Sequence, residues 1–131
     1  MAGFGPADVE RLLGDAGIVR HRGKIEATVS NAGRALELID EVGSLAAFLW
    51  RFEPSAADRP ARCDRATLAA ITTSPASVAM SKELRRRGWR FVGPTTMYAL
   101  MQAMGMVNDH LEGCVSRAEV EADRSVFVRP G

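Results

Sequence analysis

His110 and Cys114 are the two side chains in this sequence best suited to hold a metal ion. Both are ligands that zinc prefers, and a spacing of four residues would place them on one face of a helical turn. A structural zinc site needs four ligands, so this pair supplies only half of one. The other histidine, His21, lies among cations that oppose a metal, and we interpret it as solvated or phosphate-facing.

A second candidate site lies in residues 81–105, which predict two helices joined by a tight turn, a helix-hairpin-helix. Gly93 ends the turn, and Thr95 and Thr96 fall in the first turn of the next helix. Free N–H groups at a helix start bind phosphate, and glycine permits both close backbone approach and a positive φ. With Arg90 as a nearby cation, these residues could bind a DNA phosphate without reading base sequence. An ordinary pair of antiparallel helices is the alternative.

Other polar residues allow two interpretations each. Arg20, Arg22 and Lys24 begin a helix, where the helix dipole disfavours cations, which indicates either an anionic partner or a solvated face. Asp109 is a candidate acid or base, or else a capping residue. No nucleophile–histidine–acid spacing, phosphate loop or dinucleotide fingerprint is present.

The composition fits one helical domain. The chain has 131 residues, 47% of them apolar and 25% charged, with a formal net charge of +1. Nucleic-acid binding would therefore depend on a local basic patch. Trp50 and Trp89 could stack on a base, but packing is the commoner role. No apolar run approaches the roughly 20 residues of a membrane span, no signal peptide is visible, and two cysteines make no disulfide framework, so we expect a cytoplasmic protein.

Apolar residues recur at helical spacing, and no stretch alternates with period two, so the sequence predicts an all-α fold. Cap residues bound the expected helices. The first runs from Pro6 to Gly17, and a long second helix ends at Gly43. Three more run from Ser44 to Pro54, from Ser74 to Gly88 and from Pro94 to Gly105. The segment 53–65, which contains Cys63, reads as an exposed loop. Residues 116–131 read as a loose charged tail, with Val126-Phe127-Val128 folding back onto the domain.

Two stretches resemble a known family. AGIVRHRGKI at residues 16–25 and FVGPTTMYALMQA at 91–103, followed by VNDH at 107–110, are similar to DNA-3-methyladenine glycosylase I. The resemblance covers about residues 8–115. It implies a bundle of the helix-hairpin-helix glycosylase type, with residues 1–115 forming the C-terminal portion of that domain. The implied reaction is hydrolysis of the N-glycosidic bond of alkylated adenine in duplex DNA.

The resemblance also implies roles for individual residues. His110 and Cys114 match the family's C-terminal pair of zinc ligands, and Gly93, Thr95 and Thr96 match its DNA-phosphate hairpin. Phe91 departs from the wider superfamily, which usually has the first hairpin glycine at that position. The number of amides that face a phosphate depends on that position.

The resemblance further implies an N-terminal segment that this sequence does not contain. In the family, that segment supplies the Cys and His that complete the zinc site and the Glu, Trp and Tyr of the base pocket. No residue here takes those roles, so we expect half a zinc site and an impaired or inactive chain. The full-length protein is expected to be a monomer. The alternatives are a non-catalytic DNA-binding fragment and a decayed, poorly folded product.

Overall fold

The computed structural model describes all residues from Met1 to Gly131 and contains helices and no strands. The predicted all-α class is confirmed. The helices are α1 (Pro6–Gly14), α2 (Arg22–Val42), α3 (Leu45–Trp50), the 3-10 turn η1 (Ala56–Asp58), α4 (Arg65–Ala69), α5 (Pro75–Arg86), α6 (Pro94–Ala103) and α7 (Val115–Val126). None combines the length and apolar character needed to cross a bilayer.

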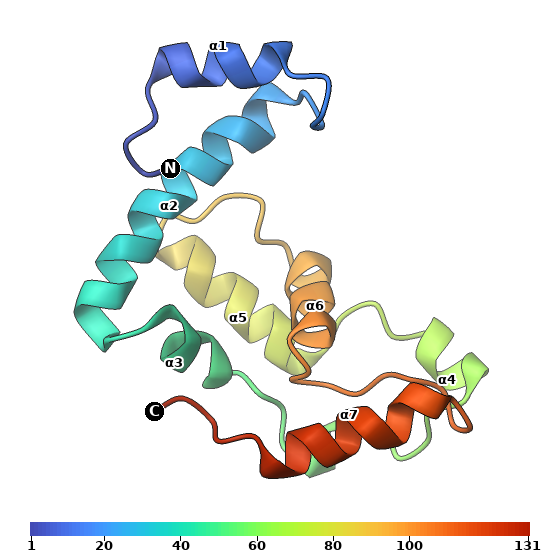
Figure 1. Cartoon of the computed structure of the whole chain (residues 1–131). Coiled ribbons are helices and arrows are strands. Elements are labelled where there is room, and N and C mark those ends of the chain that lie inside the picture. The colour runs from blue at the N-terminus through green and yellow to red at the C-terminus, as the bar shows by residue number, and fades with distance from the viewer.

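The helices form two groups joined by the long helix α2. Figure 1 shows α1 lying across the N-terminal end of α2, with α5 and α6 side by side in the middle and α7 at the far end from α1. The core lies where α2, α3, α5 and α6 meet. It contains Leu38, Phe48, Met80, Leu84, Val92, Met97, Tyr98, Met101, Met106 and Val107.

Most of the expected helix ends are confirmed by their caps. Ser44 and Ser74 each accept a hydrogen bond from the backbone three residues on, at 2.9 and 3.1 Å. Gly43 and Gly88 take positive φ angles after α2 and α5, and Pro94 occupies the first position of α6. Helix α1 is shorter than expected and ends at Gly14 rather than Gly17. The reason is Asp15, whose carboxylate accepts the N–H of Gly17 at 2.8 Å and so closes a turn.

The prediction of a loose tail at 116–131 is wrong for most of that segment, because residues 115–126 form α7. The contacts that hold this helix come from residues far away in the sequence. The buried guanidinium of Arg124 bonds to Glu53 at 2.9 Å, and the ring of Phe127 lies 4.7 Å from that of Trp50. Phe127 thus folds back as expected, whereas Val126 and Val128 remain exposed. Both tryptophans pack against the core cluster.

Candidate nucleic-acid interface and metal-binding pair

The turn between α5 and α6 begins with a glycine cap. Gly88 has a φ of +81°, its N–H donates to the carbonyl of Arg85 at 2.9 Å, and the N–H of Trp89 donates to Leu84 at 3.0 Å. These bonds satisfy carbonyls that the end of α5 would otherwise leave free. The chain then reverses and enters α6 at Gly93.

After Gly88, the second residue of the turn with a positive φ is Phe91, at +57°, whereas Gly93 has a φ of −64°. The positive φ that glycine permits is therefore not used at Gly93. An ordinary side chain in this conformation costs about 1–2 kcal/mol. The contact that favours it is edge-to-face packing of Phe91 on His21, with ring centroids 6.1 Å apart. Phe91 thus keeps the conformation that glycine takes more readily.

Two side chains from other helices hold the turn in place. Asn31 of α2 donates to the carbonyl of Arg90 and accepts its N–H, both at 2.9 Å. Ser81 of α5 donates its hydroxyl to the carbonyl of Val92 at 2.6 Å in a buried position. The sequence predicted neither of these two contacts. Asn31 lies 59 residues from its partner, and no local pattern marks it. The backbone of the predicted phosphate-binding turn is consequently fixed on both sides.

The start of α6 leaves backbone N–H groups free. No side chain caps this helix, and its first backbone bond runs from the N–H of Met97 to the carbonyl of Gly93. Thr95 and Thr96 are exposed, and their N–H groups have no acceptor within the chain. A Cβ on Gly93 would find only the guanidinium of Arg85, at 3.6 Å. The space in front of these amides is therefore open to a ligand.

The cations at the end of α5 differ in their availability. Arg86 and Arg87 are bound to carboxylates, since Glu83 accepts from both and Glu41 accepts two bonds from Arg87. These guanidinium groups hold the pKa of Glu83 at about 2. The other two, Arg85 and Arg90, are exposed and make no ion pair. Of the two, Arg85 lies at the start of α6, since its guanidinium is 3.6 Å from a Cβ placed on Gly93.

The predicted basic cluster at the start of α2 lies against the same turn. His21 caps α2, its Nδ1 accepting the N–H of Lys24 at 3.1 Å while its ring packs on Phe91. This cap was not anticipated from the sequence. Arg22 pairs with Glu10 at 2.7 Å and is not free. Arg20 and Lys24 are exposed and make no ion pair, but Lys24 lines a hollow with Phe4 and Leu12 on the α1 side.

The predicted metal-binding pair is brought together, although not on a helix. His110 lies in the loop between α6 and α7, and Cys114 is the N-cap residue of α7. Nδ1 of the histidine lies 3.8 Å from the sulfur. Two ligands on one tetrahedral zinc, with bonds of about 2.0 and 2.3 Å, stand about 3.5 Å apart. The pair therefore fits two positions of a zinc site, and no third His, Cys, Asp or Glu groups with it.

Asp109 does not cap a helix but accepts hydrogen bonds from two side chains of α6. Its Oδ2 accepts hydrogen bonds from the hydroxyl of Tyr98 at 2.7 Å and from the amide of Gln102 at 2.9 Å. Burial of the Tyr98 hydroxyl is the main cause that raises the pKa of Tyr98 above its ordinary range, and the hydrogen bond to the Asp109 carboxylate adds to it. Asp109 thus fixes the start of the His110 loop to α6.

Cys63 does not join the metal-binding pair. It is buried in the loop before α4, with its sulfur 4.0 Å from the carbonyl of Asn108. Its backbone exchanges hydrogen bonds with Glu112, each at 3.0 Å. The residue therefore packs beneath the loop, which corrects the expectation that the whole segment 53–65 is exposed.

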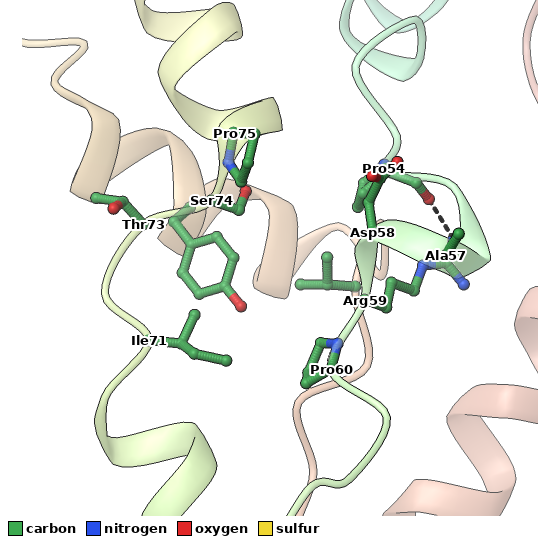
Figure 2. Close-up of a pocket in the computed structure, with 11 residues that line it drawn as sticks. Pro54, Ala57, Asp58, Arg59, Pro60, Ile71, Thr73, Ser74 and Pro75 are labelled. Carbon is green, nitrogen blue, oxygen red and sulfur yellow. Dashed lines mark hydrogen bonds between the residues drawn. The ribbon is translucent and has the colours of Figure 1, made fainter.

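A cavity of about 270 Å³ opens near the far end of α5. Figure 2 shows Pro54, Arg59 and Pro60 on one side of it, with Ile71, Ser74 and Pro75 on the other. Tyr98 of α6 and Val107 of the loop after it also line the cavity, so it lies between the start of α5 and the inner side of α6.

Comparison with known proteins agrees with this arrangement. The family model for methyladenine glycosylase matches residues 1–117. The chain is 47% identical over 108 residues to DNA-3-methyladenine glycosylase 1 of Escherichia coli, which is 82% of this chain and 56% of that protein. It is 38% identical, also over 108 residues, to DNA-3-methyladenine glycosylase of Haemophilus influenzae, covering 57% of it.

Solved structures give the same result. A crystal structure of 3-methyladenine DNA glycosylase I matches with a TM-score of 0.73 and 45% identity, covering 87% of this chain and 62% of that one. The Staphylococcus aureus enzyme, solved to explain 3-methyladenine recognition, matches with a TM-score of 0.78 and 31% identity, covering 88% and 61%. The chain spans little more than half the length of its curated relatives. In both sequence and fold, it belongs to the methyladenine glycosylase family.

Proposed function

We propose that this chain carries the DNA-gripping and metal-binding part of a 3-methyladenine DNA glycosylase, a cytoplasmic, monomeric enzyme of base-excision repair. The observation that carries the proposal is the hairpin. Its open amides at Thr95 and Thr96 lie beside the unpaired cations Arg85 and Arg90, at a turn fixed by Asn31. The relatives named above act on 3-methyladenine in DNA, which supplies the substrate class.

The proposed reaction is hydrolysis of the bond between the methylated base and its deoxyribose. Water adds to the sugar carbon, and the base leaves with the bonding electron pair. Methylation makes the base cationic, so it leaves readily, and the enzyme's task is to select and position it after extrusion from the duplex. The hairpin would hold the DNA backbone during extrusion, since phosphate contacts fix position without specifying sequence.

The zinc proposal rests on the donor pair. His110 and Cys114 would provide two of four ligands to a structural zinc, whose chemistry here is to hold chain segments together. The separation of their donor atoms, 3.8 Å, supports this assignment. The remaining ligands would come from a segment that the family resemblance implies.

A second candidate function is DNA binding without catalysis. It is favoured by one difference between the two parts of the site. The hairpin is completed by residues of this chain, including Asn31 and Ser81, whereas the metal pair has no third ligand. Base release distinguishes the candidates, and binding to duplex DNA is common to both.

Replacing Gly93 by valine is expected to weaken binding to duplex DNA about 10- to 100-fold. The new side chain would occupy the open space before the Thr95 and Thr96 amides and remove charge-assisted bonds worth about 1.5–3 kcal/mol. Because Gly93 has a φ of −64° and no close neighbours, the fold should persist. Fluorescence anisotropy with a labelled duplex measures the affinity, and circular dichroism checks the fold.

Ala99→Val provides the matched control, since Ala99 is an exposed residue of the same helix. Its affinity should equal that of the parent chain. For the parent, log affinity should fall as log salt concentration rises, because phosphate contacts release counterions. An unchanged affinity in Gly93→Val, or salt-independent binding, would show that the hairpin is not the DNA contact.

Zinc is expected to leave this chain on dialysis. Two protein ligands give none of the stability of a closed four-ligand site, so the retained metal should be far below one equivalent. Metal analysis of the dialysed chain measures it. Near-stoichiometric zinc that survives His110→Ala would show a different ligand set, and Cys63→Ser would then test whether Cys63 belongs to it.

A further inference from the structure

Helix α7 lies mostly outside the part of the chain that the family model matches, which ends at residue 117. Its C-terminal end is fixed to the body of the domain. Glu53 accepts hydrogen bonds from Arg124 at 2.9 Å and from Arg129 at 2.9 and 3.0 Å, and Phe127 packs on Trp50. Helix α7 is therefore fixed to the domain and can position the loop that its N-terminal end contacts.

The N-terminal end of α7 contacts the loop that carries the metal-binding pair. Nη1 of Arg117 donates to the carbonyl of His110 at 2.6 Å and to that of Asn108 at 3.0 Å. In return, the Asn108 amide donates to the carbonyl of Arg117 at 3.0 Å and to Glu121 at 3.1 Å. One guanidinium thus fixes the backbone of His110, while Cys114 begins the same helix.

We propose that Arg117 is a positioning residue for the metal-binding pair and that helix α7 holds Arg117 in place. The inference rests on the proposed zinc site. The loop 108–114 contains no regular structure, so a metal would have to order it at an entropic cost. Because Arg117 holds the His110 carbonyl and α7 begins at Cys114, both donors are already 3.8 Å apart without a metal.

The expected size of the effect follows from other metal sites, where removing a group that orients a ligand lowers metal affinity about 10–100-fold. Arg117→Met keeps much of the side-chain length and removes both hydrogen bonds to the loop. The metal affinity of the Arg117→Met chain should fall by about tenfold or more. Arg117→Lys, which can still donate to a carbonyl, should recover part of the loss.

Cobalt titration of the full chain tests the inference. Co²⁺ accepts the same nitrogen and sulfur ligands as zinc, and thiolate coordination gives an absorption band. Arg65→Met is the matched control, because Arg65 is exposed and makes no ion pair. We expect millimolar cobalt to give a thiolate absorption band in the parent chain, and His110→Ala to abolish it. Arg117→Met should raise the cobalt concentration at the titration midpoint about tenfold, and Arg65→Met should leave it unchanged.

The failures are distinguishable. A band that needs His110 but has the same midpoint in Arg117→Met would overturn the positioning role and leave the metal assignment standing. No thiolate band in the parent chain, or one indifferent to His110→Ala, would overturn the metal assignment and with it this inference. Thermal unfolding of each variant separates a loss of metal affinity from a loss of fold. An Arg117→Lys chain that unfolds like the parent but binds cobalt no better than Arg117→Met would also count against the positioning role.

Discussion

Alkylated duplex DNA incubated with the 131-residue chain is expected to release 3-methyladenine no faster than the same DNA without protein. Release at an enzymatic rate requires a closed pocket that stacks the flipped base and hydrogen-bonds its edge. The chain spans 56% of its Escherichia coli relative. The family resemblance implies that the base pocket comes from a segment other than residues 8–115, so we expect this chain to lack a closed pocket. Holding the DNA backbone accelerates bond cleavage only if the base is positioned as well.

The assay is chromatographic measurement of free 3-methyladenine, with the full-length Escherichia coli relative as the positive control. DNA binding by the chain, measured alongside, separates a folded but inactive protein from an unfolded one. Enzymatic release by the 131-residue chain would refute the expectation. It would show that residues described here perform the base-positioning role, and Asp109, with its bonds to Tyr98 and Gln102, would be the first to replace.

Glu53→Ala is expected to destabilise the fold by about 3 kcal/mol, the lower end of the range for breaking a buried ion pair, because this carboxylate is 14% exposed. Three guanidinium groups, from Arg59, Arg124 and Arg129, depend on it. Arg124 is 6% exposed and would keep only Glu121, at 3.9 Å from its Nε. Since a small domain has about 5–15 kcal/mol in total, urea unfolding should show a large shift in midpoint.

Glu37→Ala is the control, because its partner Arg34 is exposed and such surface pairs contribute about 1 kcal/mol or less. A Glu53→Ala chain as stable as the parent would show that α7 does not depend on Glu53. Acid provides a second measurement. Hydrogen bonding from Arg129 is the largest cause that lowers the pKa of Glu53, with the charges of Arg129, Arg124 and Arg59 adding to it.

A carboxyl group whose pKa is lower in the folded state than its usual 4.5 stabilises the fold above that value and loses this contribution as pH falls. The parent chain should therefore lose stability below about pH 4.5, and Glu53→Ala should lose less over the same interval. The difference between the two stability profiles isolates Glu53, because Glu83, with a pKa of about 2, titrates in both chains.

Local signals in the sequence sufficed wherever structure depends on neighbouring residues. Ser44, Ser74, Gly88 and Pro94 each marked a helix end correctly, because a cap involves residues only a few positions away. His110 and Cys114 do lie close together, but in a loop and at a helix N-cap and not on the helical turn from which the spacing predicted it.

Features that depend on distant residues could not be predicted in this way. The bonds from Asn31 to Arg90 and from Glu53 to Arg124 join residues 59 and 71 positions apart, and each decides a local conformation. The second bond holds α7 on the domain, and the sequence does not show it, so residues 115–126 read as a tail. Phe91 has a positive φ, which residue type alone does not assign to phenylalanine, although it occupies the position where the wider superfamily usually has a glycine; its ring packs on His21.

The attachment of the hairpin turn to α2 has a mechanical consequence. Asn31 bonds to Arg90, Arg87 bonds to Glu41, and Gly88 lies beside the side chain of Arg34, so the turn is fastened along a helix of 21 residues, about 30 Å long. A rod fastened at several points transmits displacement instead of absorbing it. A tilt of α2 should therefore move the turn and, with it, the start of α6 that carries Thr95 and Thr96.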